Sequence, residues 1–178
     1  QVTGNGANNS FPSLSPDGGS IVYTSNIAGL EQVYILDLAG GPARQLTFPT
    51  GDGTAPEISP DGNYIVYKHG DQLDRIWVMN RDGSNPHQVY YLGWDPTWSP
   101  DGQWLAFESY VDNNFDIFIL SIVDPSQALI RLTDNPASDT SPAWSPGAGR
   151  LIAFTSDRSG KPDRRRGRRP DPQCRLLP

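Results

Sequence analysis

Apolar residues gather along the chain in short runs that recur in a fixed order. In the first repeat, the run Ile-Val-Tyr at 21–23 is followed by a polar loop, the run Val-Tyr-Ile-Leu at 33–36 and a shorter segment at 44–47. Within these runs β-branched and aromatic residues stand side by side instead of alternating with polar ones. Such runs are typical of strands buried on both faces.

The same order of runs returns three more times, the last time incompletely. The corresponding apolar or strand-like segments lie at 65–67, 76–79, 87–90, 105–107, 117–120, 131–133 and 152–154. A two-sheet sandwich would leave one face of each sheet in water and would show alternation. Small sheets stacked face to face around an axis bury both faces. The pattern therefore predicts an all-β fold, a β-propeller of four-stranded antiparallel blades, incomplete at about three and a half blades.

A four-residue turn separates the first and second strands of each predicted blade. Ser-Pro-Asp-Gly occupies 15–18, 59–62 and 99–102, and a fourth copy at 145–149 lacks the Asp and gains one residue. The steps of 44, 40 and 46 residues between the Ser positions are typical of a repeat architecture. Ser, Pro and Gly at these places favour a type I turn, and the Asp can accept hydrogen bonds from nearby amides. We interpret the Asp residues as turn stabilisers, not as a ring of catalytic carboxylates.

A proline three residues before each Ser sets the phase of the repeat. We predict a propeller fragment over 1–163 and a tail outside it over 164–178, with residues 1–3 as the last strand of a preceding unit. The expected blades are approximately 11–47, 55–90, 95–133 and a partial one at 141–163. Five arginines within residues 164–169, flanked by Pro162 and Pro170, make this segment unsuitable for a blade strand, and we assign the tail no function.

Charge and composition argue against several classes of function and structure. The net charge is −6; residues 161–178 hold seven Lys or Arg against two Asp, a net +5, which leaves −11 for residues 1–160. An acidic body argues against nucleic-acid binding by the repeats. No apolar run approaches the ~20 residues of a membrane span. Cys174 is the only cysteine, which excludes an internal disulfide and a cysteine metal cluster.

The repeat has the pattern Pro-x-Trp-Ser-Pro-Asp-Gly-x-x-Ile-Ala-Phe, followed by strands of the types Ile-Tyr-Val-Met and Arg-x-Leu-Thr. This pattern resembles the TolB-like propeller repeats of bacterial envelope proteins over roughly 1–163. Similar repeats occur in the propellers of prolyl-oligopeptidase-type serine peptidases. The resemblance implies a six-bladed ring, a periplasmic or extracellular location and a protein-binding role.

One loop carries the beginning of a calcium-binding pattern. Asp112, Asn114 and Asp116 copy the first three ligand positions, but Ile117 stands where Gly is needed and Val123 where a bidentate Glu is needed. We therefore favour a solvated loop between two strands over a calcium site.

Other catalytic or cofactor patterns are missing from the sequence. His69 and His87 have no third histidine or zinc spacing beside them, and no Gly-x-Ser-x-Gly segment or phosphate-binding glycine loop occurs. We expect no catalytic residue, metal or cofactor, and no enzyme activity.

The polar positions that differ most from repeat to repeat lie in the loops before the innermost strands, at one mouth of the expected channel. These candidates are Asn8, Asn9, Asp52, Trp94, Asp95, Ser138 and Asp139. They suit a non-catalytic scaffold that binds a protein, peptide or ligand, and their acidity favours a basic or amine-bearing partner or a cation. The alternative at these positions is capping of strands and turns. The alternative functions are the accessory propeller of a serine peptidase and a metal-dependent hydrolase.

The ends of an incomplete propeller would expose apolar faces. We therefore expect self-association, or the remaining blades of a longer chain, to complete the ring.

Overall fold

We describe a computed structural model of the chain over residues 3–4, 6–48, 51–70, 73–124, 129–147 and 151–158. These residues form strands and no helix. The strands are β1 (Asn9–Leu14), β2 (Ser20–Ser25), β3 (Gln32–Asp37), β4 (Arg44–Gln45), β5 (Asp52–Ile58), β6 (Tyr64–Gly70), β7 (Asp74–Asn80), β8 (His87–Tyr90), β9 (Trp94–Trp98), β10 (Trp104–Val111), β11 (Asn114–Ser121), β12 (Ile130–Arg131), β13 (Asp139–Trp144) and β14 (Ile152–Ser156).

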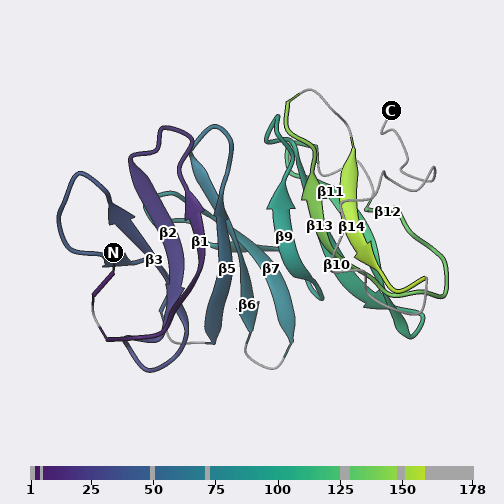
Figure 1. Cartoon of the computed structure of the whole chain (residues 1–178), viewed down its shortest axis with the longest axis horizontal. Coiled ribbons are helices and arrows are strands. Elements are labelled where there is room, and N and C mark those ends of the chain that lie inside the picture. Colours follow the sequence, from purple (N-terminus) through teal and green to yellow (C-terminus); the bar gives the residue numbers. More distant parts are fainter. Residues whose placement is uncertain are drawn as a thin grey trace. The chain divides into compact units, whose positions relative to one another are not determined.

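The strands pair in sequence order into antiparallel sheets (Figure 1). The first three sheets hold β1–β4, β5–β8 and β9–β12, and β13 pairs with β14 in a two-stranded sheet. This confirms the predicted all-β fold with four-stranded antiparallel propeller blades. The chain divides into two compact units, residues 1–96 and 97–178.

The middle strands are buried on both faces, as their unbroken apolar runs predict. In the first unit, Val22 and Ile35 of the first sheet belong to one core with Ile65, Tyr67 and Met79 of the second. In the second unit, a smaller core joins apolar side chains of β10 and β11 to the two-stranded sheet; its buried members are Ala106, Ile117, Ile119 and Ile152.

The predicted turns are present and nearly identical. In the first, the Gly18 N–H donates to the Ser15 carbonyl at 2.8 Å, and the Ser15 hydroxyl accepts from the Ser20 N–H at 2.9 Å. The Asp17 carboxylate accepts from the Gly19 N–H at 2.9 Å, as proposed for this Asp. In the fourth copy, the Ser145 N–H donates to the Leu151 carbonyl, six residues on, whereas the corresponding bonds of the other copies span five residues.

The outer strands of the first and third sheets end earlier than the sequence predicts. Strand β4 stops at Gln45 and β12 at Arg131 because a threonine side chain replaces the next backbone acceptor. The Thr47 Oγ1 accepts from the Val33 N–H, and the Thr133 Oγ1 from the Ile117 N–H, each at 2.9 Å. The side-chain bond still ties the outer segment to the neighbouring strand.

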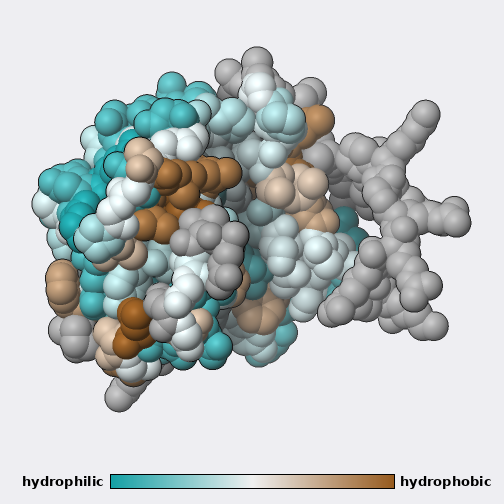
Figure 2. All heavy atoms as spheres, turned by 60° about the vertical axis from the view of Figure 1, so that its left-hand side comes forward, coloured by the Kyte–Doolittle hydropathy of each residue, from teal (hydrophilic) through white to brown (hydrophobic). Residues whose placement is uncertain are grey.

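One face of the first sheet carries exposed apolar side chains. Leu14 is 60% exposed, and Ile21 and Leu36, its neighbours in register, are only half-buried. The corresponding Ile58 and Ile65 of the second sheet are buried against the first. Figure 2 shows apolar side chains grouped at the surface on this side of the molecule. The outward face of the first sheet therefore corresponds to the face by which the second sheet packs against the first.

Three predictions fall outside the described residues: the strand at residues 1–2, the end of the partial blade at 159–163 and the tail at 164–178. Within the described part of the chain, nothing has the helical length and apolar character needed to span a membrane.

Candidate binding site at the mouth end of the blades

We call the end of a sheet at which its first strand begins the mouth end. In the first sheet, the hairpin 26–31 between β2 and β3 lies there. The Asn8 N–H donates to the Asn26 Oδ1 at 3.0 Å, and the Asn26 N–H donates to the Asn8 carbonyl at 3.3 Å. The start of β1 is thus held by the hairpin of its own sheet.

The same hairpin also holds the start of the next sheet. The Gln32 Nε2 donates to the Gly51 carbonyl at 2.9 Å, and the Gly53 N–H donates to the Glu31 carbonyl at 2.7 Å. Gly53 is required by this close approach, since a Cβ there would lie 2.7 Å from the Thr47 Oγ1. Loops at the mouth end of the first unit are therefore tied to a hydrogen-bonded frame.

A backbone feature that the sequence analysis missed recurs just inside the mouth end. The residue before each repeat proline has a left-handed φ: 49° at Phe11, 50° at Ala55, 46° at Asp95 and 52° at Ser141. The pairing register shifts at this point in β1, β5 and β13, as in a β-bulge. For a non-glycine residue this conformation costs roughly 1–2 kcal/mol. At one copy the Glu108 carboxylate offsets part of the cost by accepting from the Ser141 N–H at 2.6 Å.

The predicted site residues of β1 and β5 differ in accessibility. Asn8 and Asp52 are exposed, whereas Asn9 is half-buried. The Asn9 Nδ2 donates to the Thr3 Oγ1 at 3.3 Å and to the Ala7 carbonyl at 3.1 Å. Asn8 and Asp52 can reach a partner, whereas Asn9 organises the segment that leads into β1.

Trp94 is oriented by a carboxylate that the sequence analysis did not single out. The Trp94 Nε1 donates to the Asp74 Oδ2 at 2.7 Å, and the Lys68 Nζ lies 3.0 Å from the Asp74 Oδ1. The Gly93 N–H also donates to the Asp74 carbonyl, at 3.0 Å. The indole is half-buried and fixed by its nitrogen, while Asp95 beside it is exposed. The ring can offer a rigid apolar surface, but its N–H is already engaged.

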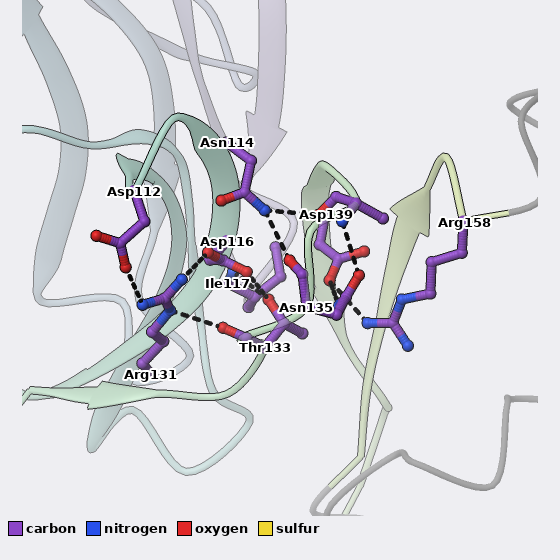
Figure 3. A network of polar contacts seen from close by, with 10 residues as sticks. Asp112, Asn114, Asp116, Ile117, Arg131, Thr133, Asn135, Asp139 and Arg158 are labelled. Carbon is purple, nitrogen blue, oxygen red and sulfur yellow. Dashed lines mark hydrogen bonds and ion pairs between the residues drawn. The ribbon is translucent and has the colours of Figure 1, made fainter.

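Ser138 and Asp139 lie in the second unit, where Asp139 is fully buried. Figure 3 shows its carboxylate beside Asn135 and Arg158. The Asp139 Oδ2 accepts from the Asn135 Nδ2 at 3.0 Å and pairs with the Arg158 guanidinium at 2.8 Å. Its Oδ1 is buried and accepts no hydrogen bond from the described residues. The Ser138 N–H donates to the Asp157 Oδ1 at 2.9 Å. The charge of the buried Asp139 carboxylate is thus balanced by Arg158, and its Oδ1 can still accept a hydrogen bond.

The calcium-like pattern begins in an exposed turn at 112–113 between β10 and β11, as expected for a solvated loop, and its two carboxylates are ion-paired. The Arg131 guanidinium lies 2.8 Å from the Asp112 Oδ2 and 2.5 Å from the Asp116 Oδ2 (Figure 3). Asp116 is fully buried, and its Oδ1 accepts from the Thr133 hydroxyl at 2.9 Å. Hydrogen bonds to Asp112 and then Asp116 raise the pKa of Arg131. The arginine supplies the positive charge that the two carboxylates need.

Asn114, the second of the three ligand positions in that pattern, has a different role. Its Nδ2 donates to the carbonyls of Asn135 and Ala137, both at 2.8 Å. This repeats in the second unit what Gln32 does in the first: a side chain at the start of a third strand holds the loop that leads to the next sheet.

The geometry of these groups suits non-covalent binding. Exposed carboxylates, backbone groups and one fixed indole face solvent at the mouth ends, whereas the buried carboxylates are paired with arginines. Among the described residues, no three His, Cys, Asp or Glu side chains gather as metal ligands.

Sequential four-stranded antiparallel sheets that pack face to face within a unit define the chain as part of a β-propeller. Its sequence matches the family described as the TolB beta propeller domain over residues 1–93 and 87–164, and the chain belongs to this family.

Individual relatives agree with this assignment. The chain is 30% identical over 149 residues to a protein named TolB homolog of Chlorobium luteolum, covering 82% of this chain and 33% of that protein. It is 28% identical over 151 residues to an uncharacterized peptidase, YuxL, of Bacillus subtilis, covering 82% and 21%. A solved structure assigned as TolB from Agrobacterium tumefaciens superposes with a TM-score of 0.74 at 28% identity, covering 84% of this chain and 54% of that one. The chain thus spans a third or less of these two curated relatives.

Proposed function

We propose that the chain is a non-catalytic propeller scaffold that binds another protein or a peptide at the mouth end of its blades. The observation that carries this proposal is the contrast between frame and loops at that end. Backbone and side-chain hydrogen bonds fix the strand starts, while Asn8, Asp52 and Asp95 remain exposed on them. A rigid scaffold that presents dissimilar polar loops is a common arrangement for specific binding.

The similarity to a TolB homolog supports this choice over catalysis. The family resemblance also favours a periplasmic or extracellular location. Of the predicted residues, we expect Trp94 and Asp95 to contribute most, because a fixed aromatic ring can be buried by a partner at low entropic cost. We expect Asp139 to act differently from these two residues, because its Oδ1 is buried and could accept a hydrogen bond from a donor group of the partner.

A peptide-selection experiment tests the proposal. Peptides would be selected from a random displayed library against the chain, and their affinities measured by isothermal titration calorimetry. We expect Trp94→Ala and Asp95→Ala each to weaken binding with little change in melting temperature. Gln88→Ala on the outer strand β8, an exposed position, is the control. Loss of binding in the control, with both mouth-end variants unaffected, would place the site elsewhere.

The second candidate function is the accessory propeller of a prolyl-oligopeptidase-type serine peptidase. It is favoured by the similarity to the Bacillus subtilis peptidase, of which this chain spans 21%. In that case a catalytic domain with a Gly-x-Ser-x-Gly segment would be encoded in the same gene. Sequencing the gene beyond the present chain distinguishes the two functions.

Either function needs the outward face of the first sheet to be covered. The exposed Leu14 and the half-buried Ile21 and Leu36 support packing against a further blade, from a second copy or from a longer chain. Native mass spectrometry of the 178-residue chain is expected to show a dimer or larger species. A monomeric, cooperatively folded chain at micromolar concentration would argue against this packing.

A further inference from the structure

Large apolar side chains are exposed at the mouth end of the first unit. We call this set the mouth rim. Its members and their exposed fractions are Ile27 (52%), Leu30 (48%), Phe48 (68%), Leu73 (52%) and Tyr91 (62%). Single exposed apolar residues are ordinary, whereas a group of them at one end of two packed sheets is a candidate interaction surface.

Hydrogen bonds show that the segments bearing these side chains share one end of the unit. Ile27 and Leu30 lie in the hairpin 26–31, which bonds to the starts of β1 and β5. Phe48 directly follows Thr47, whose hydroxyl donates to the side chain at the start of β3.

The other two members occupy equivalent places in the second sheet. Leu73 precedes Asp74 in the β6–β7 hairpin, and the Asp74 carbonyl accepts from the Gly93 N–H in the loop that carries Tyr91. Asp52 pairs in register with Gly70 at the base of that hairpin, which places the start of β5 beside it.

The exposed charged side chains at this end are negative, whereas the basic Lys68 and Arg75 are half-buried. Glu31, Asp52 and Asp95 are exposed at the same strand starts and hairpin. The nearby Lys68 is paired with Asp74 and so does not offset them. The mouth rim therefore combines apolar side chains with exposed carboxylates.

We propose that the mouth rim binds a polypeptide segment that carries both apolar and basic side chains. This rests on the proposed function and specifies the partner's chemistry. Apolar contacts supply affinity, while the carboxylates select Lys or Arg and disfavour acidic segments. A second copy of this chain is a poor occupant of this surface, because its net charge of −6 would bring like charges together.

Synthetic peptides of defined composition provide the probe. A Lys/Leu peptide, a Lys/Ser peptide of the same charge and a Glu/Leu peptide of the same hydrophobicity would be titrated into the full chain by fluorescence anisotropy. We expect the Lys/Leu peptide to bind most tightly, with the other two at least about tenfold weaker, since each lacks one of the two required contacts.

Leu30→Ser and Leu38→Ser form a matched pair of variants. Leu38 is similarly exposed, at 42%, but lies at the opposite end, where its N–H donates to the Gly19 carbonyl beside the first turn. We expect Leu30→Ser to weaken Lys/Leu binding about fivefold and Leu38→Ser to leave it unchanged. Phe48→Ser is a second variant at the mouth rim, and circular dichroism melting confirms that each variant is folded.

Three results would overturn the inference: equal weakening by Leu30→Ser and Leu38→Ser, equal binding of the Lys/Leu and Glu/Leu peptides, or no effect of Leu30→Ser and Phe48→Ser. If rim variants have no effect while Trp94→Ala still weakens binding of library-selected peptides, the proposed function stands and the rim assignment fails. If neither set of variants matters, both fail.

Discussion

Replacing Arg131 by Met should strongly destabilise the second unit. Asp116 is fully buried, and the substitution would remove its ion-pair partner while keeping much of the apolar stem of the arginine. The Thr133 hydroxyl would remain as a donor to the carboxylate. Breaking a buried pair from one side costs ~3–5 kcal/mol, and we expect the lower end, about 3 kcal/mol, because the arginine side chain is 28% exposed. At ~2–4 °C per kcal/mol for a chain of this size, the melting temperature should fall by ~6–12 °C.

The matched control is Arg81→Met. Arg81 also pairs with an aspartate, but its Nη1 lies 3.8 Å from the Asp17 Oδ2 and the two side chains are 33% and 64% exposed. An exposed pair of this kind contributes ~0–1 kcal/mol. The Arg81 Nη2 also donates to the Ser20 hydroxyl at 3.0 Å, a hydrogen bond that adds ~0.5–1.5 kcal/mol to the expected loss. Differential scanning calorimetry at pH 7 would compare both variants with the parent. A fall for Arg131→Met no larger than that for Arg81→Met would show that Asp116 does not depend on the pair. The double variant Asp116→Asn/Arg131→Met should recover part of the loss, because no buried charge is then left unpaired.

Two further predictions concern the first unit. Gly53→Ala should lower the urea midpoint by the equivalent of ~1–3 kcal/mol, since its Cβ would lie 2.7 Å from the Thr47 Oγ1; an unchanged midpoint would mean that the strand start is not tightly held. The Ser59 hydroxyl, followed by the Asn63 amide groups, lowers the pKa of Asp61 below 3.8 against the opposing effect of burial. The unfolded chain therefore takes up this proton first as the pH falls, and the stabilisation is present above the ordinary pKa and lost as the pH falls through the folded-state value. Ser59→Ala should make the free energy of unfolding, measured in urea, less dependent on pH below about 4. An unchanged pH dependence in this variant would show that the Ser59 hydroxyl does not lower the pKa of Asp61.

Local signals explain what the sequence predicts well. Runs such as Ile65–Tyr67 are apolar on both faces and form buried middle strands, and each Ser-Pro-Asp-Gly segment carries its turn in its own residues. The outer-strand ends depend on a longer-range contact, because Thr47 and Thr133 reach backbone amides 14 and 16 residues earlier. The signal that could have revealed them is the constant nine-residue step from each of these threonines to the next repeat proline.

The candidate site is harder to predict because accessibility depends on partners that are distant in sequence. Asp95 and Asp139 both read as polar residues at strand starts, yet Asp95 is exposed and Asp139 is buried against Arg158, 19 residues later. Trp94 reads as a free anchor, but Asp74, 20 residues earlier, fixes its indole nitrogen. Whether these residues bind a partner stays a prediction.

The hairpin that holds the start of the next sheet has a consequence for protein engineering. Gln32 belongs to the first sheet, yet its side-chain amide bonds to the Gly51 carbonyl just before the second, and Asn114 bonds in the same way to the loop that leads to β13. If a blade were transplanted as one whole sheet, the bond from its third strand to the start of the following sheet would be lost. At its other end, its first strand would meet the hairpin of an unrelated preceding sheet. The exchangeable module therefore runs from the third strand of one sheet through the second strand of the next. Chimeras joined within the β2–β3 and β6–β7 hairpins would keep each strand start with the side chain that secures it.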